Sequence, residues 1–160
     1  MKNIYDVLAD LNIEYEKHDH PAVFSVKEAE QYDQGIDAGK SKNLFLRNRK
    51  GDKYYLLVAE NISKVDLKKP QSFLNESRLS FASPDRLKEY LGLTPGSVSP
   101  FGLINDSSKS VKVLIDKNLL KFKKLGFHPN INTSTLVIKT DDFKKFLDWT
   151  ENSITYVELN

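Results

Sequence analysis

The sequence predicts an α+β fold, in which helices flank a mixed or mostly antiparallel sheet. The apolar runs 44–46 and 54–58 have the composition of strands, and the polar stretch 48–52 between them is typical of a hairpin turn. Helical patterns are interspersed irregularly among the strand patterns. This order favours an α+β fold over a doubly wound parallel sheet, in which helices and strands alternate regularly.

Four segments have helical patterns. Apolar residues recur at helical spacing in the first, and Ser25 opens the second with the Ser-x-x-Glu form of a capping box. Ser83 is an N-cap followed by proline, and Asp141 begins a segment with phenylalanines on one face. The predicted helices cover residues 3–11, 25–34, 83–92 and a stretch that begins at residue 141.

Three further segments are predicted to be strands because they are short, apolar and rich in β-branched residues. They cover residues 111–115, 135–138 and 154–159. No repeat, low-complexity tract or linker separates the predicted elements. We therefore expect a single domain over residues 1–160.

The composition narrows the function classes. The 160 residues include 24 Lys or Arg and 22 Asp or Glu, so the formal net charge is +2. This balance argues against a protein that coats nucleic acid by charge alone, but it allows one that binds a few phosphates locally. The chain has no cysteine, which excludes disulfides, thiolate metal sites and cysteine nucleophiles.

Targeting signals are not evident in the sequence. The N-terminus has no apolar segment of secretory length. No stretch approaches the roughly 20 apolar residues that cross a bilayer. We therefore expect a cytoplasmic protein that does not act at a membrane.

The first motif that could carry chemistry is Gly39-Lys40-Ser41-Lys42, just before an apolar strand. It contains the letters Gly-Lys-Ser, but a P-loop also needs a glycine at position 34, where this chain has glutamine, and a helix afterwards. Lys42 at the mouth of a strand could hold a phosphate or polarise a carbonyl. The alternative is a lysine of the solvated surface.

The second motif is the loop from Leu93 to Gly102, in which two prolines and two glycines frame small hydroxyl residues. Prolines stiffen such a loop, and glycine lets a ligand approach the backbone amides. These amides could bind hydroxyls or a developing oxyanion. The alternative is a plain connection between a helix and a strand.

The third motif surrounds His128, which lies among polar side chains just before a strand. A single histidine in such a loop can be structural or can take part in catalysis. His18 and His20 have the His-x-His spacing that binds metal on a strand, but no third ligand is evident. We therefore expect no metal site.

These three stretches, in this order, resemble the YbaK/ProX family of aminoacyl-tRNA deacylases, whose fold also occurs as the editing insertion of bacterial prolyl-tRNA synthetases. The resemblance is carried by Lys42-Asn43-Leu44-Phe45-Leu46, by the loop from Gly96 to Pro100 and by His128-Pro129. It runs over nearly the whole chain. It implies the editing-domain fold, a single domain whose mostly antiparallel sheet forms a barrel-like core flanked by helices.

The resemblance also implies a catalytic site without metal or cofactor. Lys42 would be its key polar residue, holding the phosphate of the terminal adenosine or orienting the ester. The backbone at Gly96 would face the ester and the terminal ribose, and His128 would shape the amino-acid end. Further substrate-binding positions implied by the family are Asn43, Ser97, Val98, Ser99, Pro100 and Asn130.

The implied function is trans-editing, the hydrolysis of the ester that joins a wrong amino acid to the 3′ acceptor end of a tRNA. The motifs resemble most closely the free-standing ProX-type members, which implies alanine on proline tRNA as substrate and prolyl-tRNA synthetase as a further partner. Water assisted by the vicinal ribose hydroxyl would be the nucleophile. Many members have a Gly-His pair near the C-terminus, where this chain has residues 149–153 without one.

Other functions fit the same residues. The enzyme could remove cysteine or another small amino acid from proline tRNA. The chain could instead be a non-catalytic module that binds a tRNA end or a small ligand. A further class is a regulatory or structural domain that docks on an acidic partner through the basic segment 117–124.

Overall fold

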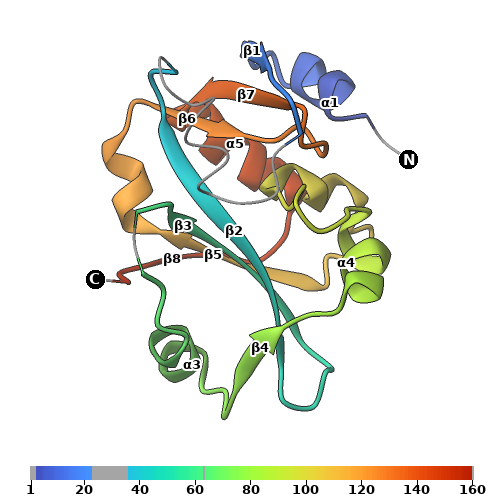
Figure 1. The fold of residues 1–160 in the computed structure, drawn as a ribbon, viewed down its shortest axis with the longest axis vertical. Coiled ribbons are helices and arrows are strands. Elements are labelled where there is room, and N and C mark those ends of the chain that lie inside the picture. The colour runs from blue at the N-terminus through green and yellow to red at the C-terminus, as the bar shows by residue number, and fades with distance from the viewer. Residues whose placement is uncertain (1–2, 23–35, 63, 160) are drawn as a thin grey trace.

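The computed structural model describes residues 3–22, 36–62 and 64–159, which form one mixed sheet with helices packed against it (Figure 1). The strands lie in the order β1-β7-β6-β2-β3-β5-β8, and β4 pairs with β2 outside this path. Their bounds are β1 (Glu16–Asp19), β2 (Gly39–Asn48), β3 (Tyr54–Glu60), β4 (Leu79–Phe81), β5 (Val111–Asp116), β6 (Lys124–Phe127), β7 (Ser134–Lys139) and β8 (Ile154–Val157).

The helices are short, and three of the four predicted ones are confirmed as α1, α4 and α5. The helix predicted over 25–34 lies outside the described residues. Ser83 caps α4 as predicted, since its side chain accepts a hydrogen bond from the Arg86 N–H. In the described part of the chain, no helix combines the length and the apolar composition of a membrane span. The helices are α1 (Ile4–Asp10), α3 (Lys68–Leu74), α4 (Pro84–Leu91), α5 (Thr140–Thr150) and the 3-10 helices η1 (Pro100–Asn105) and η2 (Lys117–Lys121).

The five predicted strands are confirmed as β2, β3, β5, β7 and β8. The predicted turn 48–52 joins β2 to β3 as an antiparallel hairpin. β1, β4 and β6 were not predicted, because these three- and four-residue strands lack the run of β-branched and apolar residues that marks the equally short β8. Tertiary pairing, and not local composition, makes these segments strands.

β2 connects the two halves of the sheet. It pairs antiparallel with β3 over seven residues that end at Arg47. At its start it pairs in parallel with β6, where Lys40 lies opposite Gly126. A Cβ atom on Gly39 would lie 2.3 Å from the Phe122 ring, so this close approach requires glycine. The ten residues of β2 therefore serve two different sets of neighbours.

The sheet is open, so the barrel-like closure implied by the family resemblance is not observed among the described strands. β1 and β8 end the path, and each pairs with one neighbour. β1 is an edge of charged and polar residues, a composition that discourages pairing with another chain. The expected mixed, mostly antiparallel sheet is confirmed, because β1–β7, β2–β3, β2–β4 and β6–β7 are antiparallel and three pairings are parallel.

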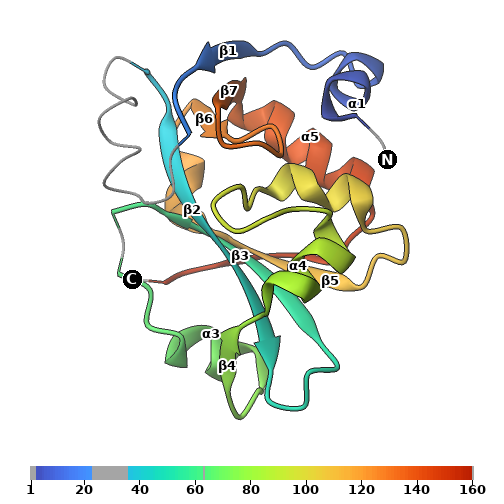
Figure 2. The same ribbon diagram turned by 45° about the vertical axis from the view of Figure 1, so that its right-hand side comes forward.

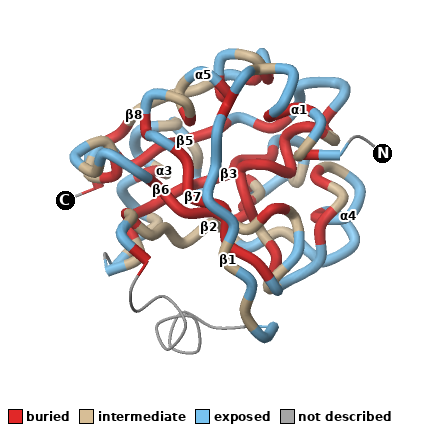
Figure 3. The backbone as a smooth tube through the Cα atoms, turned by 90° about the horizontal axis from the view of Figure 1, so that it is seen from above, coloured by how far each residue is buried: buried red, intermediate tan, exposed pale blue. Residues whose placement is uncertain are grey.

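The central strands are buried on both faces because their side chains alternate between two apolar clusters. In β3, Val58 faces the larger cluster, and Leu57 and Ala59 face the smaller one. In Figure 2, α4 and α5 lie to the right of β2 and β3, and α3 lies below them on the left. Figure 3 shows the buried backbone concentrated in the central strands.

Aromatic side chains join three elements inside the larger cluster. The Phe101 ring of η1 lies edge-on to the rings of Phe127 and Phe146, with centroids 5.7 and 5.2 Å apart. The Phe127 centroid is also 4.6 Å from that of Phe143. Such pairs contribute about 0.5–1.5 kcal/mol each beyond the buried area. These rings fix η1 against β6 and α5, and thereby fix the end of the loop before η1.

A buried polar cluster holds the turn after η1 against the end of α5. The Asp106 carboxylate accepts hydrogen bonds from the Val111 N–H at 2.9 Å and from the Asn152 side-chain amide at 2.8 Å. The same amide donates to the Val111 carbonyl at 2.8 Å. Both Asp106 and Asn152 are buried, so these bonds replace the water contacts that burial removes.

We predict that Asn152→Ala lowers the free energy of unfolding by about 1–3 kcal/mol, because it removes a donor from two buried acceptors on Asp106 and Val111. Urea unfolding followed by circular dichroism measures this change. Ser153→Ala is the matched control, since the neighbouring Ser153 is exposed, and it should change stability by less than about 0.5 kcal/mol. Equal stability of Asn152→Ala and the wild type would contradict the prediction.

Candidate active site

β2 carries Lys42 at a half-buried position, opposite Ala59 of β3. Within the described part of the chain, the Lys42 side chain has no hydrogen-bond or ion-pair partner. The prediction that Lys42 precedes the strand is wrong, because the segment from Gly39 onwards already pairs with β6 and β3. The register of a strand, and not a loop, therefore sets where the Lys42 side chain starts. A strand here also excludes a P-loop, which leads into a helix.

Asn43 follows Lys42 and points to the other face of the sheet, since successive strand residues alternate. It lies opposite Val58, and its side-chain amide donates to the Ser41 hydroxyl at 3.3 Å. The two neighbouring residues that the family resemblance assigns to one site therefore start on opposite faces of β2. The structure places Asn43 beside Ser41, with which it shares a face.

The pairing of β2 with β6 ends just before Lys42 and His128. Lys40 lies opposite Gly126, and the two strands run in the same direction. Lys42 lies two residues further along β2, and His128 lies one residue after the end of β6 at Phe127. This register brings the segments of the lysine and the histidine to the same end of the pairing.

The loop between α4 and η1 has a constrained backbone. The Ser97 N–H donates to the Thr94 carbonyl at 3.1 Å, which closes a turn around Pro95 and Gly96. Gly96 has a φ of +90°, in the left-handed region that side chains disfavour. A glycine at this position therefore lets the turn form and leaves its backbone open to the approach of a ligand.

The residues after Gly96 support the loop from inside the protein. Ser99 is fully buried, and its hydroxyl accepts a hydrogen bond from the Phe101 N–H at 3.2 Å, which caps η1. Ser97 and Pro100 are also buried, and the half-buried Val98 packs against the larger apolar cluster. Ser99 and Val98 therefore have structural contacts, and the exposed residues of this loop are Thr94 and Pro95, next to Gly96.

Asn130 ties the β6–β7 loop to the start of η1. Its side-chain amide donates to the Phe101 carbonyl at 3.4 Å. Its φ of +66° is left-handed, a conformation that asparagine tolerates better than most residues. The Asn130 Oδ1 is buried without a hydrogen-bond partner among the described residues. This contact brings the loop that carries His128 next to the loop that carries Gly96.

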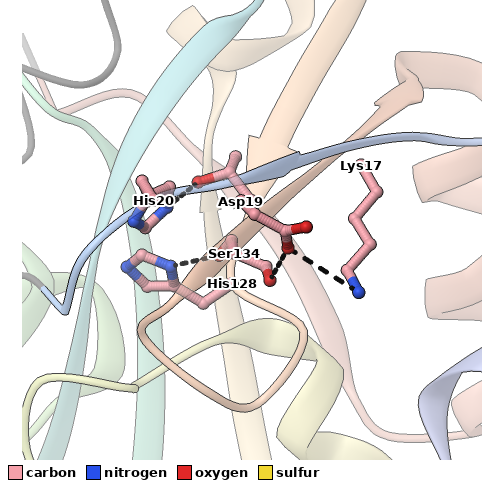
Figure 4. A network of polar contacts seen from close by, with 6 residues as sticks. Lys17, Asp19, His20, His128 and Ser134 are labelled. Carbon is pink, nitrogen blue, oxygen red and sulfur yellow. Dashed lines mark hydrogen bonds and ion pairs between the residues drawn. The ribbon is translucent and has the colours of Figure 1, made fainter.

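His128 is oriented by the backbone of β7. Its Nδ1 donates to the Ser134 carbonyl at 3.0 Å (Figure 4). Because a carbonyl only accepts, Nδ1 carries the proton, and Nε2 is the acceptor of the neutral ring. An acceptor held in this way suits a group that binds a substrate ammonium or that takes a proton from water.

Ser134 also holds β1 through its side chain. Its hydroxyl donates to Asp19 Oδ1 at 2.8 Å, and Lys17 Nζ lies 3.7 Å from the same oxygen (Figure 4). The Ser134 hydrogen bond, followed by the positive charge of Lys17, keeps the pKa of Asp19 below its ordinary value. One buried serine therefore supports His128 with its carbonyl and Asp19 with its hydroxyl.

Sequence reasoning did not find Asp19 and Ser134 as neighbours of the site. They are 115 residues apart in the chain and meet because β1 pairs with β7. No spacing in the sequence signals a contact over such a distance. The only local sign is that Asp19 precedes His20, which drew attention through its His-x-His spacing.

The rings of His18 and His20 contact different side chains and do not face a common metal-binding position. His18 Nε2 lies 3.6 Å from the Glu16 carboxylate, whereas His20 Nε2 lies 3.0 Å from the Thr135 hydroxyl. In the ranges that the structure describes, no three His, Asp or Glu side chains are grouped to hold a metal ion. We derive no metal chemistry from this pair of histidines.

The basic segment 117–124 carries less unpaired charge than its sequence indicates. Three of its lysines form ion pairs with glutamates of other elements, which neutralises much of the local charge. Lys123 is exposed. The docking of an acidic partner on this segment therefore gains little support. The pairs are Lys117–Glu158 at 3.7 Å, Lys121–Glu60 at 3.0 Å and Lys124–Glu16 at 3.2 Å.

Comparison with known proteins defines the class. The sequence profile of the aminoacyl-tRNA editing domain matches residues 20–146, a stretch that contains Lys42, Gly96 and His128. The chain belongs to the aminoacyl-tRNA editing domain family. The family expected from the sequence motifs is thereby confirmed.

Individual relatives match over most of their length. The prolyl-tRNA editing protein ProX of Acetoanaerobium sticklandii is 42% identical over 95% of this chain and 93% of that protein. The prolyl-tRNA synthetase associated domain-containing protein 1 of Bos taurus is 33% identical over 88% of this chain and 84% of that protein. A crystal structure of a candidate trans-editing enzyme for prolyl-tRNA synthetase shares the fold, with a TM-score of 0.71 and 18% identity over 98% of this chain and 95% of that one.

We predict that Ser134→Ala raises the pKa of Asp19 towards its ordinary value, because the largest cause of its lowering is the bond from that hydroxyl. A pH titration of the side-chain carboxyl carbon by NMR measures it. A carboxyl whose pKa is lower in the folded chain stabilises the fold above the unfolded-state pKa, and this contribution is lost as pH falls through the folded-state value. Ser107→Ala, at an exposed serine, is the control. An unchanged Asp19 titration in Ser134→Ala would refute the assignment.

Proposed function

We propose that the chain is a trans-editing aminoacyl-tRNA deacylase, which hydrolyses the ester bond of a mischarged tRNA. The observation that carries the proposal is the 42% identity to a prolyl-tRNA editing protein over 95% of the chain. Two contacts are consistent with it: β2, which carries Lys42, pairs with β6 shortly before His128, and Asn130 of the His128 loop donates to the Phe101 carbonyl at the start of η1. The Gly96 loop ends at η1.

The proposed substrate is alanine attached to proline tRNA. The names of the curated relatives support a prolyl-tRNA substrate and an association with prolyl-tRNA synthetase. An editing site is expected to act on a small amino acid. One methylene changes binding in a synthetase pocket by only about 1–3 kcal/mol, so a second site that hydrolyses the smaller, wrong amino acid improves accuracy. Removal of cysteine or another small residue is the alternative within the same class.

The proposed reaction is attack of water on the ester carbonyl. The bond between the carbonyl carbon and the ribose oxygen breaks, which releases the free amino acid and a tRNA with its terminal hydroxyl restored. The chain has no cysteine, so a protein thiol is excluded as nucleophile. The vicinal ribose hydroxyl is proposed to orient or activate the water, so that the substrate assists its own hydrolysis.

The roles of the site groups follow from their chemistry. The Lys42 ammonium is proposed to hold the phosphate of the terminal adenosine or to orient the ester. Backbone N–H groups near Gly96 would stabilise the negative charge that develops on the carbonyl oxygen. His128, with Nε2 as acceptor, would contact the amino-acid end. Asn43, Ser97–Pro100 and Asn130 would support these groups.

The proposed contact with tRNA is limited to the 3′ acceptor end. A net charge of +2 is compatible with such a contact, because only a few phosphates need be neutralised there. Mischarged tRNA forms where translation takes place, so we propose that the protein acts in the cytoplasm. Prolyl-tRNA synthetase is the proposed second partner.

We predict that Lys42→Ala lowers the rate of alanine release from mischarged proline tRNA at least about 100-fold, because it removes the only proposed cation of the site. Release of labelled alanine measures the rate. Lys112→Ala is the matched control, since Lys112 is an exposed lysine on β5 and should retain full activity. If the wild type and Lys42→Ala release alanine no faster than buffer, the catalytic assignment is wrong.

A panel of mischarged tRNAs decides between the alternatives. We expect faster release of alanine than of cysteine or serine from proline tRNA, and no release of proline. Turnover of every small amino acid on any tRNA body would contradict the proposed specificity. Binding of tRNA ends without turnover of any species would favour the non-catalytic module.

A further inference from the structure

His20 lies beside His128 at the end of β1. Its backbone N–H donates to the Thr133 carbonyl at 2.9 Å, which extends the pairing of β1 with β7 by one residue. The two imidazole rings have centroids 6.0 Å apart and planes at 62° (Figure 4). The His20 ring therefore packs edge-on against the ring of the proposed site histidine.

The His20 ring is held at both of its nitrogens. Nδ1 donates to the Pro21 carbonyl at 2.9 Å, and Nε2 lies 3.0 Å from the Thr135 Oγ1. Because Nδ1 carries the proton, Nε2 of the neutral ring accepts a hydrogen bond from the Thr135 hydroxyl. A ring held at both nitrogens cannot rotate freely, so it presents a rigid surface to its neighbour.

Both imidazole rings form hydrogen bonds with consecutive residues of one buried strand, β7. The Ser134 carbonyl holds His128, and the Thr135 hydroxyl holds His20. Ser134 and Thr135 are 2% and 7% exposed, so neither group moves without a change in β7. Rotation of the His128 ring away from Ser134 is therefore opposed on one flank by a ring fixed to the same strand.

We propose that His20 is a positioning residue for the hydrolysis, holding the His128 ring in the orientation in which Nδ1 bonds to Ser134 and Nε2 is the acceptor. This inference rests on the proposed function, because it takes His128 as a group of the site. His20 acts through His128 and is given no contact with the substrate. The His20 ring contributes its shape, and its two hydrogen bonds make that ring rigid.

The first test needs no substrate. The chain has three histidines, so long-range ¹H–¹⁵N spectra of labelled protein at about pH 8 can distinguish the tautomer of each. We expect His128 of the wild type to carry its proton on Nδ1. In His20→Ala, part of the His128 population should move to the form protonated on Nε2. An identical His128 signature in both proteins would overturn the proposal.

The second test is kinetic. His20→Ala should lower kcat about tenfold with little change in KM, because a misplaced group affects the reacting geometry more than the binding of tRNA. His18→Ala is the matched control, a histidine of β1 two residues before His20 whose ring faces the Glu16 carboxylate, and it should leave both constants unchanged. Equal losses in His18→Ala and His20→Ala would show a general effect of β1 and overturn the proposal.

A milder variant guards against misfolding. Thr135→Val keeps the shape of a strand residue and removes the hydroxyl that holds His20, so it should shift the tautomer signal and kcat in the same direction by a smaller amount. An unaltered His128 signature together with unaltered kcat in this variant would contradict the role of the Thr135 bond. A wild type that hydrolyses no mischarged tRNA would refute the proposed function, while the spectra still decide whether His20 holds His128.

Discussion

The double pairing of β2 is the constraint on which the arrangement of the site depends. The first residues of β2 pair in parallel with β6, and the rest pair antiparallel with β3. Lys42 follows the point where the first pairing ends, and His128 lies one residue beyond the end of β6. Gly39 permits this arrangement, because any side chain there would collide with the Phe122 ring. A one-residue slip of this register would send Lys42 to the opposite face.

A second support comes from β7, which holds the polar part of the site. Ser134 bonds to His128 with its carbonyl and to Asp19 with its hydroxyl, and the adjacent Thr135 bonds to His20. These hydrogen bonds hold side chains near the protein surface against a buried strand. Aromatic contacts of Phe101 with β6 and α5 fix the opposing loop. The proposed site thus combines Lys42 on a strand with two loops whose ends are anchored in the core, which suits preorganised catalysis.

Much of the fold could be predicted because its longer elements carry strong local signals. β3 and β5 are apolar runs, α5 has phenylalanines on one face, and α4 has a serine N-cap followed by proline. The short strands β1, β4 and β6 carry no such signal, because their hydrogen bonds are made with distant partners. The start of β2 was missed for the same reason, since polar residues become strand only where β6 lies beside them.

The sequence by itself determined the family, the absence of thiol chemistry and the motifs of Lys42, Gly96 and His128, because these depend on residue identity and order. Only the tertiary structure decided that the sheet is open, that Lys42 lies within a strand and that Ser99 is a buried cap. It alone placed His20 against His128 and assigned the proton to Nδ1. The physical reason is that strand pairing brings together residues more than 100 positions apart, and local sequence patterns do not indicate such contacts.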